Sequence, residues 1–159
     1  MGITRQFGDD LIREQVAAFR ANLENATTFM LKYLGEELVK HAKEMHNYTD
    51  QSGNLTNSIG YVVAHKKEVV SIGGLVSVGE ETGGEEAGMK LINTMVKRNT
   101  AAFSLIIVAG MNYAAYVEAL GYNVILPAEL KAKHDVPAAF ERLRKVALQK
   151  AHEKFGIWI

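Results

Sequence analysis

The sequence predicts an α+β domain in which an antiparallel β-sheet of about three to five strands is flanked by a long N-terminal helix and a C-terminal helix. Three observations predict this fold. A helix-spaced apolar pattern without proline runs through residues 9–46, β-branched residues dominate 61–78 and 102–109, and helix-spaced apolar residues return after Pro137. The 159 residues, 48% of them hydrophobic, suit a single domain over 1–159.

The first helix is expected to begin at Asp9 and Asp10, because carboxylates suit the positive end of a helix dipole. The pattern leaves open whether one helix runs through or two helices meet near residues 25–28. Gly35 costs a helix about 1 kcal/mol relative to alanine, which a helix of this length tolerates. A helix longer than a small domain needs must bury part of its apolar stripe elsewhere, which hints at a partner subunit.

The segment 48–60 separates helical sequence from strand sequence. Asp50, Ser52, Gly53 and Asn54 are turn formers, and Asn54 is a candidate cap for one helical turn. Within that turn, Leu55 and Ile59 share a face because they are four residues apart.

Strands are predicted over 61–65 and 68–78, with Lys66-Lys67 at the hairpin tip and Gly73-Gly74 at a bulge or bend. Residues 79–88 hold four glycines and four glutamates, and they predict an exposed loop. A short amphipathic helix is expected from Met89, followed by the apolar strand at 102–109.

Asn112 is the candidate cap of a helix from Tyr113 to Leu120, and Gly121 is expected to end that helix. A short strand over 122–126 and a brief helical piece over 127–135 come next. Pro137 at a first turn predicts the start of the last helix. The expected buried face of this helix consists of Phe140, Leu143, Val146, Ala147 and Ala151.

Composition and motifs argue against several function classes. Eighteen basic and eighteen acidic residues give zero formal net charge, which disfavours a specific nucleic-acid binder. The chain has no cysteine, no P-loop, no run of about 20 apolar residues for a membrane span and no histidine pair at metal-ligand spacing. We therefore expect no catalytic residue, no cofactor and no metal.

Two other readings stay open at this point. A small enzyme would bring Asp50, Glu118 and a histidine such as His65 together in a cleft, although Asp50 is equally suited to stabilising its own turn. A monomeric cytoplasmic adaptor or binding domain would show neither catalysis nor self-association.

Three segments, taken in order, resemble the HK97 gp10-like family of tailed-phage head–tail connector and tail-completion (minor tail) proteins. The resemblance rests on Asp-Gln-Ser-Gly-Asn-Leu followed by Ser-Ile, on Tyr-Ala-Ala-Tyr-Val-Glu followed by Gly, and on Pro-Ala before the last helix. The motif residues are Asp50, Gly53, Asn54, Leu55, Ser58, Ile59, Tyr113, Tyr116, Val117, Glu118, Gly121 and Pro137. The chain departs from the family pattern at Ser52 and Thr56 and in a probable insertion at 80–101.

The resemblance implies a non-enzymatic structural part of a phage or prophage virion, assembled in the host bacterial cytoplasm as a ring at the head–tail junction or at the end of the tail tube. The implied partners are further copies of the chain and neighbouring head–tail or tail-tube proteins, with no membrane and no specific nucleic acid. The 48–60 turn and the 113–121 helix would pack beside the sheet and fix its edge. Candidate interface residues are Glu80, Glu81, Glu85, Glu86, Arg142, Lys145 and Trp158.

Overall fold

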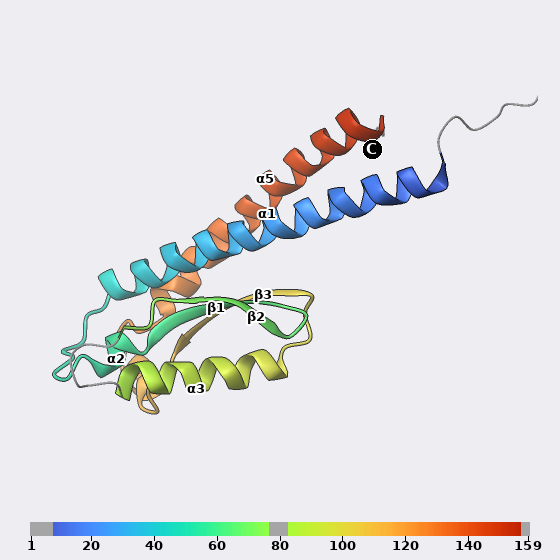
Figure 1. Cartoon of the computed structure of the whole chain (residues 1–159). Coiled ribbons are helices and arrows are strands. Elements are labelled where there is room, and N and C mark those ends of the chain that lie inside the picture. The colour runs from blue at the N-terminus through green and yellow to red at the C-terminus, as the bar shows by residue number, and fades with distance from the viewer. Residues whose placement is uncertain (1–7, 77–82, 157–159) are drawn as a thin grey trace, which may run out of the picture.

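The computed structural model describes residues 8–76 and 83–156. In chain order the elements are α1 (Asp9–Glu44), α2 (Asn54–Asn57), β1 (Ile59–His65), β2 (Glu68–Gly73), α3 (Gly83–Arg98), β3 (Phe103–Ala109), α4 (Ala114–Ala119) and α5 (Leu126–Phe155) (Figure 1). The α+β prediction is confirmed: a three-stranded antiparallel sheet is flanked by a long N-terminal helix and a C-terminal helix.

The central strand of the sheet is β1, which pairs with β2 on one side and β3 on the other. Lys66 and Lys67 form the predicted hairpin tip, and both have positive φ, as a two-residue type I′ turn requires. The register shifts between Val63 and Ala64, opposite β2, so the irregularity lies inside the hairpin. Gly73 ends β2 and Gly74 bends away at φ 80°, so the strand is shorter than the predicted 68–78.

Helices cover both faces of the sheet (Figure 1). Because side chains alternate along a strand, β1 presents Tyr61 and Val63 to α1 and presents Val62 and Ala64 to α3. The first core cluster contains Leu31, Leu38, Val39 and Ala42 of α1, and the second contains Ile92 and Val96 of α3. The segment predicted as an insertion therefore supplies one layer of the core.

The helix glycine of α1 is explained by contact with the sheet. A Cβ on Gly35 would lie 2.4 Å from the Tyr61 ring, so only glycine lets α1 approach that ring. The Tyr61 hydroxyl then donates to the Glu36 carboxylate at 2.8 Å. Helix α1 continues without a break through 25–28, which settles the question of one helix or two.

The loop predicted over 79–88 is wrong for residues 83–88, which form the first turns of α3. The glycines there serve packing: a Cβ on Gly84 would lie 2.5 Å from the Asn54 carbonyl oxygen, and one on Gly110 would lie 2.1 Å from the Gly88 nitrogen. Helix α3 thus meets, backbone to backbone, the chain just before β1 and the chain just after β3. Glu85 and Glu86 suit the N-terminal end of the α3 dipole.

Three predictions about the C-terminal part are wrong. Helix α4 has Tyr113 rather than Asn112 at its N-cap, and residues 122–126 form no strand. Helix α5 begins at Leu126 and runs through Pro137. Pro137 and Lys133 are exposed, so water can reach the Lys133 carbonyl group that the proline leaves without a donor. Gly121, at φ 89°, follows α4 as predicted.

Candidate interaction surfaces

The most unusual part of the molecule is a two-helix arm, formed by residues 9–26 of α1 and 139–155 of α5. Figure 1 shows the two helices continuing side by side past the sheet. Every buried residue of α1 lies between Thr27 and Ala42, and the buried residues of α5 are Pro127 and Ala128. The arm therefore contributes no fully buried side chain to the core of a single copy.

The two helices of the arm are joined by an apolar seam. Ile12, Val16, Phe19, Leu23 and Ala26 are spaced alternately four and three residues apart, which is the spacing of a helix–helix seam. Near the tip, the Phe19 and Phe155 rings meet edge to face with centroids 5.6 Å apart. Because α5 ends there, Ile12 and Val16 remain half exposed.

The predicted buried face of α5 is only partly correct. Leu143, Ala147 and Ala151 are half-buried, whereas Phe140 and Val146 are more than 40% exposed. The reason is that α1 is the one described element that lies against this part of α5, while the sheet ends further back (Figure 1).

One groove follows the arm between α1 and α5. It consists of three adjoining hollows of about 490, 500 and 760 Å³; the first two share Leu143 and Val146, and the last two share Phe19 and Lys154. We call this feature the arm groove; along α1 it is lined by Leu11, Ile12, Val16, Phe19, Leu23, Met30 and Tyr33. Phe29, one helical turn before Tyr33, is 74% exposed. An exposed apolar stretch of this length is typical of a protein-binding surface.

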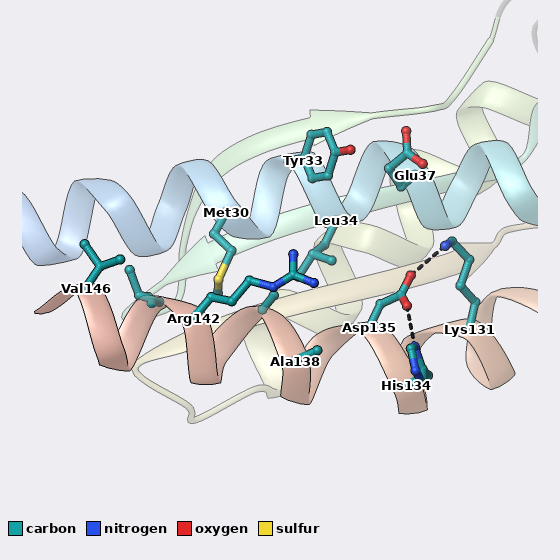
Figure 2. Close-up of a pocket in the computed structure, with 12 residues that line it drawn as sticks. Met30, Tyr33, Leu34, Glu37, Lys131, His134, Asp135, Ala138, Arg142 and Val146 are labelled. Carbon is teal, nitrogen blue, oxygen red and sulfur yellow. Dashed lines mark hydrogen bonds and ion pairs between the residues drawn. The ribbon is translucent and has the colours of Figure 1, made fainter.

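Charged groups border the arm groove mainly along α5. At its inner end, the Asp135 carboxylate is hydrogen-bonded to the His134 ring at 2.8 Å and to the Lys131 ammonium at 2.5 Å. These two hydrogen bonds hold the pKa of the Asp135 carboxyl below its usual value. Figure 2 shows Arg142 reaching from α5 into the space beneath α1. Arg142 and Lys150 form no ion pair with another described residue, so both cations are available to a partner.

The first motif segment has a structural role in every contact that the structure gives it. The Asp50 carboxylate accepts the Thr56 N–H at 2.7 Å, and Ser52 Oγ accepts the Asn54 N–H at 3.3 Å. Gly53 has φ 74° at the N-cap of α2, so the cap predicted at Asn54 is wrong. Leu55 and Ile59 are both buried, but the helical turn predicted to hold both ends at Asn57, and Ile59 begins β1.

In the second motif segment, the small side chains point into the protein and the large ones point toward solvent. Ala114 is buried and Val117 is half-buried, whereas Tyr116 is 67% and Leu120 57% exposed. Tyr113, also partly exposed, shares their face because the three residues are spaced three and four apart. We call Tyr113, Tyr116 and Leu120 the α4 patch. The motif helix thus presents its aromatic face to solvent rather than packing it beside the sheet.

Glu118 has a role that the sequence did not suggest. Its Oε1 accepts the N–H groups of Ile125 at 2.9 Å and Leu126 at 2.6 Å, so it satisfies donors at the start of α5. Gly121 allows the chain to turn back between Glu118 and these donors.

The residues of the enzyme reading do not converge in one cleft. His65 stacks on Phe103 with ring centroids 4.1 Å apart, at the end of β1 far from the 50–58 turn. His65 lies six positions after Ile59 along the strand, which is about 20 Å at the usual rise per residue. The Asp50 and Glu118 carboxylates are each bonded to separate backbone donors.

The charged interface candidates fall on different parts of the molecule. Glu85 and Glu86 open α3, whereas Arg142 and Lys145 lie on the arm. One copy therefore does not bring these acidic and basic groups together. Glu80, Glu81 and Trp158 lie outside the described residues. The α4 patch was not predicted as a contact surface, although three large apolar residues on one face of a short helix were the signal for it.

Within residues 8–76 and 83–156, no cluster of three or more histidine or carboxylate side chains is arranged to hold a metal ion. In the same ranges, none of the helices combines the length and apolar character needed to span a bilayer. No family model, curated protein or solved structure matches the chain.

Proposed function

We propose that this chain is a structural protein of a tailed-phage or prophage virion, which joins head to tail or completes the tail by assembling into a ring and catalyses no reaction. The observation that carries the proposal is the arm: helices of 36 and 30 residues extend past the sheet and leave large apolar side chains exposed in a single copy. Such a surface is stabilised when a partner covers it.

The resemblance to the HK97 gp10-like family supports the same function. Its motif residues act as structural supports here, since Asp50, Ser58 and Glu118 each bond backbone groups of neighbouring segments. Zero formal net charge leaves little repulsion between copies of the chain. On this proposal the protein works in the virion, with further copies of itself and adjacent head–tail or tail-tube proteins as partners.

The test is the native mass of the protein, measured by light scattering over a range of concentrations, alone and with the portal or tail-tube protein of the same phage. A discrete ring-sized species supports the proposal. A strict monomer under every condition, with those partners present, overturns it and favours the monomeric adaptor, for which the arm groove would be the binding site.

A further inference from the structure

Among the residues that the structure describes, two exposed apolar surfaces lie apart. The arm groove extends to Phe155 at the end of α5. The α4 patch is an exposed cluster of Tyr113, Tyr116 and Leu120 beside the start of α5, to which Glu118 ties it. About 30 Å of helix separates Leu126 from Val146 at 1.5 Å per residue, so the α4 patch does not reach the middle of its own groove.

We infer that the α4 patch of one copy docks into the arm groove of the next copy, in a head-to-tail contact. This inference rests on the proposed function and names the two surfaces that would join neighbouring subunits. A contact between two different surfaces of the same chain is heterologous, and repeating it produces a closed ring when the rotation between copies closes. A groove that paired with itself would instead give a two-fold dimer.

The size and chemistry of the hollow suit the side chains of the α4 patch. The hollow between Tyr33 and Arg142 has about 490 Å³, which is ample for tyrosine and leucine side chains from a neighbour. Tyrosine suits such a site because its ring buries apolar area while its hydroxyl keeps a hydrogen-bond partner at the rim. The Arg142 guanidinium can supply a donor to that hydroxyl or lie over the ring.

Charge favours this pairing over groove against groove. Residues 99–130, which include the α4 patch, contain Glu118 and Glu129 and no lysine or arginine. The groove lining carries the cations Lys131, Arg142, Lys150 and Lys154 and the anions Glu37, Asp135 and Glu153. Because Lys131 is paired with Asp135, the remaining cations outnumber the remaining anions by three to two. Two grooves face to face would bring these cations together, whereas the α4 segment brings none.

The docking area is small for a single protein–protein contact. From Leu11 to Tyr33 the groove is about 33 Å long at 1.5 Å per residue. A strip of that length and the width of one helix, about 10 Å, corresponds to roughly 600–700 Å² on the two partners together. The α4 patch covers only part of the groove. The contact is therefore of the small, weak class on its own and becomes stable when it repeats around a closed ring.

The first experiment uses one variant for each surface: Tyr116→Asp for the α4 patch and Val146→Asp for the arm groove. Both side chains are exposed in a single copy, so circular dichroism and thermal unfolding should match the unchanged protein. Each variant alone should associate at least about tenfold more weakly, because an aspartate cannot replace buried apolar surface. The control is Val70→Asp, an exposed valine on β2 outside both surfaces.

An equimolar mixture of the two variants decides the geometry. Each variant keeps one intact surface, so the mixture should form a 1:1 heterodimer, measurable by native mass spectrometry, and should not grow further. The inference is overturned if Tyr116→Asp assembles as the unchanged protein does. It is also overturned if the mixture, raised to concentrations at which a single weak contact would form, associates no more than either variant alone.

Disulfide cross-linking gives an independent readout, because the chain has no cysteine of its own. Variants Tyr116→Cys and Val146→Cys, one of them carrying a mass tag, should form the mixed disulfide far faster than either homodisulfide. A ring that forms with disulfides between two Val146→Cys chains would sink the docking inference and leave the proposed function standing. A mixed disulfide that forms only in open chains, without any ring in the presence of portal or tail-tube protein, would contradict the proposed function. It would leave the docking inference standing.

Discussion

Ser58 and Gly110, 52 positions apart in the chain, are joined by hydrogen bonds at the junction of the sheet with its two motif segments. Ser58 Oγ accepts the Gly110 N–H at 3.1 Å, and the Ser58 carbonyl accepts the same N–H at 3.1 Å. The hydroxyl also accepts the Met111 N–H at 3.3 Å and donates to the Leu55 carbonyl at 2.7 Å. One fully buried side chain thus links α2, the end of β3 and the approach to α4.

Replacing Ser58 with alanine should destabilise the protein by about 1–3 kcal/mol, because the Met111 N–H and the Leu55 carbonyl lose their bonds to the hydroxyl. The measurement is the free energy of unfolding in urea. The matched control is Ser52→Ala, which removes an exposed hydroxyl with one long bond and should cost less than half as much. Equal losses at the two serines would contradict the role assigned to Ser58.

Gly35→Ala should lower stability even though alanine is the better helix former by about 1 kcal/mol. The added Cβ would lie 2.4 Å from the Tyr61 ring, and that ring is held by the Glu36 carboxylate and the core. Overpacking of this kind costs about 1–3 kcal/mol or more. The comparison is thermal unfolding of Gly83→Ala. Gly83 lies in α3, and the nearest atom to a Cβ added there would be the Asn54 side-chain oxygen at 3.8 Å. A gain in stability at Gly35 would show that the close approach is not needed.

Sequence patterns predicted the elements whose signal is local. The periodicity of α1, the strands around Lys66-Lys67 and the apolar strand at 103–109 all follow from side-chain spacing. One error arose because glycine is common both in loops and at close contacts between backbones. Gly84 and Gly88 indicated a loop by composition, but in the structure they allow α3 to approach the Asn54 and Ser58 carbonyls.

Tertiary placement accounts for the remaining errors. Pro137 was expected to start a helix, because its missing N–H costs nothing there. It lies instead inside α5, where water can reach the carbonyl group of the exposed Lys133. Phe140 and Val146 have helical spacing, but none of the described residues forms a second layer over the arm. Spacing tells which residues share a face and does not tell whether the same chain supplies the surface opposite.

Stability should fall as the pH rises above 10, and part of that fall should come from Tyr61. Burial, and next the bond to the Glu36 carboxylate, raise the pKa of the Tyr61 hydroxyl above its ordinary value of 10.0. The unfolded chain therefore loses this proton first, so the stability that Tyr61 supplies is complete below pH 10 and is lost as the pH climbs through the folded pKa.

Urea unfolding of the unchanged protein and of Tyr61→Phe, from pH 8 to pH 11, isolates this contribution. At pH 8 the free energy of unfolding of the phenylalanine variant should be lower by about 0.5–1.5 kcal/mol, because the hydrogen bond is lost. Above pH 10 its stability should fall less steeply than that of the unchanged protein. A residual slope is expected, because burial also raises the pKa of Tyr48 and Tyr113. Parallel curves for the two proteins would contradict the assignment.

Glu118 should act as the cap of α5, with its acceptor geometry mattering more than its charge. Glu118→Ala removes the acceptor of the Ile125 and Leu126 N–H groups and should cost about 1–2 kcal/mol, the usual price of a lost helix cap. Glu118→Gln keeps a carbonyl oxygen in the same place and should cost clearly less. Because the same bonds tie α4 to α5, the alanine variant should also speed amide exchange across 114–126 without changing that of β1. An alanine variant as stable as the unchanged protein would leave Glu118 with no capping role.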